Sequence, residues 1–383
     1  MLNRRNFVAL GAGAIFTSTL GAKMTFASAA TTKRFVFIIQ RGAADGLGTI
    51  APVGDPGFVS QRGALAEDFA SAAKLDSMFA LHPGMTTVAG LYQAKQALFV
   101  HAVASPYRDR SHFDGQNVLE TGGTSAYALK DGWLNRLLSL LPREDKAIAL
   151  AATVPMALRG PVEVASYAPS ALPDATDDLL HRVASMYAGD PQLHGLWEQA
   201  TATRMLTSDM AADNGRNAAA TGDLAAKLLS AEGGARVAMI ETGGWDTHAQ
   251  QRARLGVQLR GLDGMIAALK AGLGPLWNDT MVLVATEFGR TVKVNGTGGT
   301  DHGTGSAAML LGGAVNGGRV LADWPGLGDA ALYEGRDLKP TMALDTLIAS
   351  AVGSHFDLTG AQAAAKLFPN MQASRPIQDL VRA

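Results

Sequence analysis

The chain of 383 residues contains no cysteine. This absence excludes disulfide bonds and also excludes a cysteine nucleophile. The core must therefore stabilise the fold, and a hydrophobic content of 47% is enough for one large α/β domain or two smaller ones. Internal repeats and low-complexity tracts are also lacking, so we expect residues 30–383 to form one domain.

Long hydrophobic runs are lacking too, except for an uncharged stretch at residues 8–22. Arg4 and Arg5 precede this stretch, and Ala27-Ser28-Ala29 follows it with the small-x-small pattern of a cleavage site. Paired arginines before a mildly apolar segment are typical of a twin-arginine export signal. The alternative is a membrane anchor, but about 15 apolar residues fall short of the roughly 20 that span a bilayer. We expect residues 1–29 to be a signal peptide.

The expected mature protein works in the periplasm or outside the cell, after contact with the twin-arginine export machinery. Cleavage after Ala29 removes three basic residues and no acidic one, which leaves 30 basic against 34 acidic residues. A small negative net charge gives no electrostatic reason to expect nucleic acid or an anionic membrane as a partner. The remaining sequence offers no membrane span, so we expect the mature chain to be soluble.

Short β-rich runs alternate with longer helical stretches along the chain. Strands are expected at 35–39, 98–103, 237–240, 281–284 and 307–311, and helices near 86–96, 114–141, 174–231 and 248–272. Continuous apolar runs fit strands that are covered on both faces. The alternation predicts an α/β fold with a doubly wound, mostly parallel sheet flanked by helices, and all five strands are expected in the parallel core. Residues 150–235 are interpreted either as a substrate-selecting cap or as scaffold.

Acidic and histidine residues follow the expected strands or lie in glycine-rich loops beside them. They are Asp45, Asp246, His248, Glu287, Asp301 and His302. In an open α/β sheet the ligand site lies outside the carboxyl ends of the strands, where residues distant in sequence meet. Carboxylate and imidazole together suit zinc, manganese or iron better than calcium. The pattern predicts a metal-dependent hydrolase.

Three of these residues also have a structural interpretation. Asp45 precedes a glycine and is also explained as a turn residue. Asp246 or Thr247 would cap the helix that follows. Glu287 closes an apolar strand and must be paired or bound, and an ion pair with Arg290 would satisfy it.

Ser111 has two interpretations that are compatible with one another. With Asp114 three residues later it forms a capping box at a helix start. A hydroxyl at a helix amino end is also well placed to meet an anionic ester or a metal. Arg108 and Arg110 would suit a phosphate or sulfate group, or would be solvated.

These segments carry a resemblance to known families. The order Asp45, Ser111, Asp246-x-His248, Glu287 and His302 resembles the alkaline phosphatase and sulfatase superfamily. The segments RSHFDGQN, GGWDTHAQQ, TEFGR and GTDHGTG behind the arginine pair resemble still more closely an exported bacterial family catalogued as domain of unknown function 1501. The similarity spans nearly the whole mature chain.

The superfamily resemblance implies an alkaline phosphatase-like sheet that holds one or two divalent ions, with zinc or manganese expected. Asp246, His248 and His302 would hold the first ion, Asp45 and Glu287 the second, and Ser111 would be the nucleophile. The chain departs from the phosphatases at Phe288, where they have histidine, so His112 or Asp301 would have to supply the missing ligand. Formylglycine chemistry of the sulfatase type is rejected, because the Cys/Ser-x-Pro-x-Arg motif is absent.

Taken together, the residues and the resemblance predict a metal-dependent hydrolase of phosphate or sulfate esters, with surface glycans or lipids as candidate substrates. The alternative is a non-catalytic binding or assembly protein that keeps the fold and handles an exported polymer. Phe288 favours the alternative, whereas Asp45, Ser111 and His302 favour the enzyme.

Overall fold

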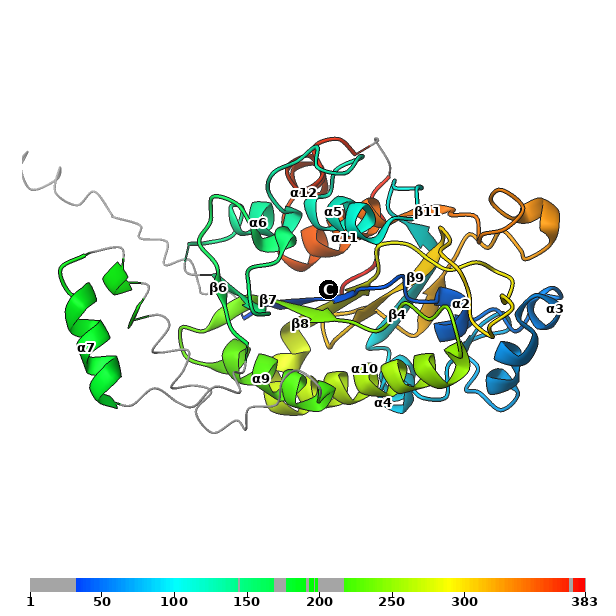
Figure 1. Cartoon of the computed structure of the whole chain (residues 1–383), viewed down its shortest axis with the longest axis horizontal. Helices are drawn as coiled ribbons and strands as arrows, with labels where there is room; N and C mark the ends of the chain where they lie inside the picture. Colours follow the sequence, from blue (N-terminus) through cyan, green and yellow to red (C-terminus); the bar gives the residue numbers. More distant parts are fainter. Residues whose placement is uncertain are drawn as a thin grey trace, which may run out of the picture. The chain divides into compact units, whose positions relative to one another are not determined.

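The computed structural model describes residues 32–143, 145–168, 177–190, 193–195, 197–198, 217–371 and 375–382 (Figure 1). The expected signal peptide at residues 1–29 lies outside the described residues. No helix within these ranges has both the length and the apolar character needed to cross a membrane.

One large sheet forms the centre of the domain. Its strands are β1 (Arg34–Gln40), β4 (Ala97–Ala104), β5 (Lys146–Leu150), β6 (Ala165–Ser166), β7 (Ala235–Thr242), β8 (Thr280–Ala285), β9 (Ser306–Leu311), β10 (Arg319–Leu321) and β11 (Met342–Ala343). Their order is β10-β4-β9-β8-β1-β7-β5-β6, and β11 also pairs with β4. β2 (Ile50–Ala51) and β3 (Ala80–Leu81) form a separate antiparallel pair.

The sheet is mostly parallel, with one reversed strand. β9 runs antiparallel to both of its neighbours, β4 and β8, whereas the other pairings in this sheet are parallel. The expectation that residues 307–311 belong to the parallel core is therefore wrong. A parallel connection needs a crossover, usually helical. Residues 286–305 contain no helix and lead directly back along β8.

Helices cover both faces of the sheet (Figure 1). One face carries α4 (Thr86–Gln93), α9 (Ala218–Ser230) and α10 (Gln251–Leu273), and the other carries α5 (His112–Thr121), α6 (Trp133–Leu138), α11 (Leu344–His355) and α12 (Gly360–Leu367). Further α-helices are α2 (Gly46–Thr49), α3 (Phe58–Arg62) and α7 (Asp177–Tyr187). The expected α/β fold with a mostly parallel, helix-flanked sheet is confirmed.

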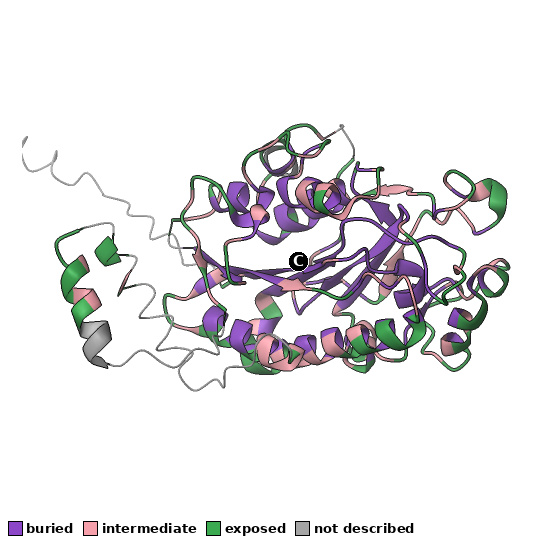
Figure 2. Ribbon diagram, in the orientation of Figure 1, coloured by how far each residue is buried: buried purple, intermediate pink, exposed green. Residues whose placement is uncertain are grey.

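The continuous apolar run of β1 reflects the burial of this strand on both faces of the sheet. Val36 and Ile38 pack into the core beneath α4, α9 and α10. Phe35, Phe37 and Ile39 alternate with them and pack into the core beneath α5, α6, α11 and α12. All five side chains are fully buried, as the colouring of the central strands in Figure 2 shows. Burial on both faces removes the polar alternation of a half-exposed strand.

Two of the expected helices match the structure within a few residues, namely α4 and α10. The stretch expected as one helix at 114–141 divides into α5 and α6, because Gly122 ends α5 in a left-handed conformation. The stretch expected at 174–231 contains α7 and α9, and part of the segment between them lies outside the described residues.

Candidate metal centre

The carboxyl edge of the sheet gathers most of the expected site residues. Asp45 follows β1, Asp246 follows β7, Glu287 follows β8, and His112 follows β4. His302 precedes β9, and because β9 is reversed, its amino end lies at the same edge. The reversal of this strand therefore allows a residue before a strand to meet residues that follow strands.

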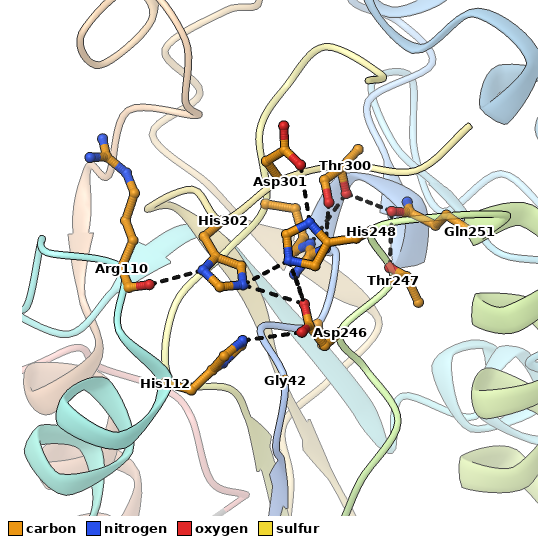
Figure 3. A network of polar contacts seen from close by, with 12 residues as sticks. Gly42, Arg110, His112, Asp246, Thr247, His248, Gln251, Thr300, Asp301 and His302 are labelled. Carbon is orange, nitrogen blue, oxygen red and sulfur yellow. Dashed lines mark hydrogen bonds and ion pairs between the residues drawn. The ribbon is translucent and has the colours of Figure 1, made fainter. Parts of the chain in front are cut away.

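The side chains of His112, His248 and His302 converge on the carboxylate of Asp246 (Figure 3). His248 Nε2 and His302 Nε2 lie 3.0 and 3.4 Å from Asp246 Oδ1, and His112 Nε2 lies 3.5 Å from Asp246 Oδ2. The Nε2 atoms of His248 and His302 are 3.0 Å apart. Ligand atoms about 2.0–2.1 Å from a tetrahedral zinc ion would lie about 3.3 Å from one another. The separations among His248 Nε2, His302 Nε2 and Asp246 Oδ1, 3.0–3.4 Å, are close to this value.

The three imidazoles present the same nitrogen to the Asp246 carboxylate, because each uses Nδ1 to contact an oxygen. The contacts are His112 Nδ1 to Glu287 Oε1 at 2.9 Å, His248 Nδ1 to Asp301 Oδ1 at 3.0 Å, and His302 Nδ1 to the Arg110 carbonyl at 2.9 Å. A carbonyl or carboxylate oxygen accepts, so Nδ1 carries the proton and the neutral ring keeps a lone pair on Nε2. Metal-bound histidines are held in this way.

Asp246 is paired with a buried cation. Arg290 Nη1 donates to Asp246 Oδ1 at 2.6 Å, and the Arg290 side chain is fully buried. The alternative interpretation of Glu287, as the ion-pair partner of Arg290, is therefore wrong. Partial burial alone would raise the pKa of Asp246, but Arg290 and the neighbouring histidines His248 and His112 outweigh it and lower the pKa. The carboxylate is thus held in its charged form.

The remaining ionisable groups differ in their tendency to carry charge. The hydrogen bond with Glu287 raises the pKa of His112 above its ordinary value, against the opposing effect of burial. Burial lowers the pKa of His302, and the nearby His112 adds to this effect. His112, Asp246 and His302 form a group whose ligand atoms all lie within 4.8 Å of one another.

Glu287 is fully buried beside the cluster and contacts protein donors. Its Oε1 accepts hydrogen bonds from the Gly42 amide, His112 and Gln116. Burial alone would raise the pKa of Glu287, but hydrogen bonds, that of His112 first, lower it below its ordinary value. Phe288, which follows it, stacks on His112 with ring centroids 5.1 Å apart.

The Asp45 carboxylate contacts Arg62 and not the histidine cluster. Its carboxylate forms an ion pair with Arg62, and both side chains are 1% exposed. It also accepts from the Gln251 amide and from Leu47 N–H, so the turn interpretation describes its local contact correctly. The structure therefore does not combine Asp45 and Glu287 into the second ligand set that the resemblance implies.

Ser111 occupies the amino-cap position of α5 with an extended backbone, as expected, but its hydroxyl makes no capping hydrogen bond. The Ser111 amide instead donates to the Tyr107 hydroxyl at 3.1 Å. The side-chain contact of the expected capping box is therefore wrong. Ser111 lies between Arg110, whose carbonyl contacts His302, and His112. This position places its backbone beside the cluster.

The other expected supporting residues have protein partners. Arg108 donates to the carbonyls of Ser105 and Tyr107. Arg110 forms ion pairs with Asp337 and Glu334. The alternative that both guanidinium groups are only solvated is wrong, and their binding of a phosphate or sulfate group stays a prediction.

Asp246 does not cap α10, the helix that follows it. Gln250 is the amino-cap residue of α10, in a left-handed conformation, and it makes no side-chain capping contact. Thr247 donates instead to the Gln251 side chain at 2.9 Å. The capping interpretation of Asp246 and Thr247 is therefore wrong.

A family model described as "Protein of unknown function (DUF1501)" matches residues 32–367. The chain belongs to this family. No curated protein matches the chain. The family resemblance inferred from the sequence segments is confirmed by this match.

Solved structures that resemble this DUF1501 protein include enzymes of the alkaline phosphatase and sulfatase type. Alkaline phosphatase from the Antarctic bacterium TAB5 is 11% identical over 88% of this chain and 99% of that chain, with a TM-score of 0.37. The zinc complex of the periplasmic domain of EcEptC from Escherichia coli is 8% identical over 73% of each chain, with a TM-score of 0.35. Phosphonate monoester hydrolase of Agrobacterium radiobacter is 11% identical over 76% of this chain and 70% of that chain, with a TM-score of 0.32. Likenesses this weak carry no argument about chemistry.

Several contact residues at the site of this DUF1501 protein were not found by sequence reasoning. They are Gly42, Arg62, Gln116, Gln251, Asn295 and Thr300. One of them, Gln116, could have been predicted from the sequence. It follows His112 by four residues on α5 and therefore lies on the same helix face. The others make contacts that no local sequence pattern indicates, whether the partner is near, as Asp301 is to Asn295, or distant, as Glu287 is from Gly42.

Proposed function

We propose that this protein is a metal-dependent hydrolase of phosphate or sulfate esters that works with one divalent ion, zinc or manganese, after twin-arginine export to the periplasm. The observation that carries the proposal is the convergence of His112, His248 and His302 on the carboxylate of Asp246.

The donor set fits a divalent ion. Three imidazole nitrogens and one carboxylate suit zinc or manganese. His112 Nε2 is buried and has no hydrogen-bond partner, so its lone pair is available for a cation. When bound, a divalent ion supplies Lewis-acid stabilisation of an ester oxygen.

Within the donor set itself, the protein contributes no net charge. The negative charge of Asp246 is matched by the positive charge of Arg290 at 2.6 Å. The three imidazoles bind an ion in their neutral form. Glu287 and Asp301, which contact His112 and His248, add two negative charges outside the donor set, so the preference for an anionic ester would rest on direct contact between the ion and the ester oxygen.

Ser111 is the proposed nucleophile. A bond would form between its Oγ and phosphorus or sulfur while the ester oxygen leaves and takes up a proton, and water would then hydrolyse the serine ester. Its position between Arg110 and His112 supports this role. The side-chain contacts of Arg110 with Asp337 and Glu334 keep that part of the loop in place.

Two observations favour the second candidate, a non-catalytic binding or assembly protein. Phe288 replaces a potential ligand and stacks on His112. Arg62 occupies the carboxylate of Asp45 in a buried ion pair. Both features remove ligands that a two-metal enzyme would use.

The first test is the metal content of the exported, mature protein, measured by plasma mass spectrometry. We expect about one zinc or manganese ion per chain, reduced in His302→Ala. His194→Ala is the matched control, because His194 is about half exposed and pairs with Glu198 outside the cluster. An absence of bound ion in every protein would reject the metal centre.

Turnover of p-nitrophenyl phosphate and p-nitrophenyl sulfate then separates the two candidates. The enzyme hypothesis expects hydrolysis of at least one ester by the metal-loaded protein and its loss in Ser111→Ala with unchanged metal content. Metal binding without turnover of either ester would favour the binding protein. Turnover at the wild-type rate in Ser111→Ala would contradict the assignment of the nucleophile.

A further inference from the structure

We infer that Glu287 is a positioning residue for the metal centre: it holds the His112 imidazole so that Nε2 faces Asp246 and His302, and it does not bind the ion itself. This inference rests on the proposed function, because it assumes that an ion binds among these side chains.

The carboxylate of Glu287 is already occupied by protein donors. Its Oε1 accepts from the Gly42 amide at 2.8 Å, from His112 Nδ1 at 2.9 Å and from Gln116 Nε2 at 3.1 Å. Its Oε2 accepts from the Thr286 hydroxyl at 2.9 Å. The residue is fully buried. A cation at Oε1 would have to displace these donors in a region that water does not reach.

A line of contacts fixes the orientation of the Gln116 amide. Arg41 Nη1 lies 2.8 Å from Gln116 Oε1, and a guanidinium nitrogen can only donate. The oxygen of Gln116 must therefore face Arg41, which leaves its nitrogen facing Glu287. Arg41 is in turn held by ion pairs with Glu120 and Glu241. The ion pairs of Arg41 with Glu120 and Glu241 thus help to fix the Gln116 amide with its NH₂ group toward Glu287.

The same logic fixes the tautomer of His112. Glu287 Oε1 already accepts from two N–H donors, the Gly42 amide and Gln116, so it also accepts at its contact with His112, and His112 Nδ1 carries the proton. Nε2 of the neutral ring then has a lone pair, and it is buried 3.5 Å from Asp246 Oδ2 without a hydrogen-bond partner. The stacked ring of Phe288 restricts rotation of the imidazole. Carboxylates that act on a ligating histidine in this way orient the ring and raise its basicity.

The inference is tested by a double-mutant cycle on the dissociation constant for Zn²⁺, measured by competition with a chromophoric chelator. We expect Glu287→Gln to weaken binding about 10- to 100-fold. His112→Ala should also weaken it. The combined variant should bind no more weakly than His112→Ala alone, because a residue that acts through His112 has nothing left to position.

Cobalt substitution supplies a second readout. The visible absorption of the Co²⁺-saturated protein should keep its band positions and intensities in Glu287→Gln, because the ligand set is unchanged, and should change in His112→Ala. If Glu287→Gln does not fold, Gln116→Leu takes its place in the cycle. It removes one donor to Glu287 and no expected ligand, so we expect a smaller loss of affinity that also vanishes in the His112→Ala background.

The outcomes distinguish this inference from the proposed function. Losses that add in the combined variant, or a changed Co²⁺ spectrum in Glu287→Gln, would show that Glu287 binds the ion and would overturn the positioning role alone. An unchanged affinity in Glu287→Gln would also overturn it. Failure of the wild-type protein to bind either ion would reject the metal centre and the inference with it.

Discussion

His248 and His302 are separated by 54 positions in the chain, yet their Nε2 atoms lie 3.0 Å apart. Each ring has its Nδ1 against an oxygen, so the neutral tautomers direct two lone pairs toward one another. Such a contact is repulsive unless a proton or a cation lies between the nitrogens. The pair is therefore most stable with a proton or a cation between the two Nε2 atoms. A divalent ion there would accept both lone pairs.

Metal binding should stabilise the folded protein. An ion that binds only the native state at 100 times its dissociation constant adds about 2.7 kcal/mol to the free energy of unfolding. We expect Zn²⁺ to raise the thermal midpoint of the wild-type protein and a chelator to reverse the increase. The increase should be much smaller in His248→Ala and intact in the control His194→Ala. An equal increase in all three proteins would place the binding outside the cluster.

The buried ion pair of Asp45 and Arg62 should be sensitive to removal of one partner. Both side chains are 1% exposed, and Arg62→Met leaves the Asp45 carboxylate without its cation. Breaking a buried pair in this way costs about 3–5 kcal/mol. Urea denaturation should show this loss. The control Arg252→Met removes an exposed pair with Glu67 and Asp68 and should leave the midpoint nearly unchanged.

His101 should make the stability depend on pH. Burial lowers its pKa to about 4, because the ring is fully buried and the hydrogen bond of Nε2 with the Ile50 carbonyl, at 2.8 Å, offsets only part of this effect. The unfolded chain, with a pKa of about 6.5, binds the proton first as the pH falls. Stability is therefore complete above about pH 6.5 and declines toward pH 4, by up to about 3 kcal/mol for this residue.

Unfolding free energies of the wild-type protein and His101→Gln, measured between pH 7 and 4.5, test this dependence. The variant should lose a large part of the slope, whatever its stability at pH 7. His355, whose pKa burial also lowers to about 4, should account for much of the slope that remains. Identical slopes in the two proteins would contradict the assignment to His101.

Gly42 should not tolerate a side chain. Its φ of +120° is rarely adopted by other residues, and a Cβ atom would lie 2.6 Å from the Asp246 amide nitrogen. Gly42→Ala should cost about 1–3 kcal/mol from backbone strain alone. The control is Gly90→Ala on the exposed side of α4, where a Cβ meets nothing within 4 Å. That change should be neutral or stabilise by roughly 0.5–1 kcal/mol, as helix propensity predicts. Equal denaturation midpoints for the two variants would contradict the close approach at Gly42.

The positions of the main strands could be predicted because their apolar runs report burial directly. The run at 35–39 became β1, and the runs at 237–240 and 281–284 became its two neighbours. The run at 307–311 also became a strand, but its direction could not be read from the run. An apolar strand looks the same in a parallel and in an antiparallel pairing, and the direction depends on the connection before it.

The candidate site was predictable in part for the same reason. Asp246, His248 and His302 follow or precede strands, and the structure brings them together. His112 was expected only as a supporting residue for the second ion, but it lies against Asp246 and Glu287. Their ligand roles remain predictions, since an aspartate beside histidines is consistent with hydrogen bonding alone.

The sequence by itself determined which segments are buried, which polar residues end them, and to which family the chain belongs, because these properties depend on residues close together along the chain. Only the tertiary structure decided that Arg290 pairs with Asp246 and that Arg62 pairs with Asp45. It also decided that the reversed β9 brings His302 to the carboxyl edge. Charge pairing and strand direction depend on which segments become neighbours in space, and local sequence patterns carry no information about that choice.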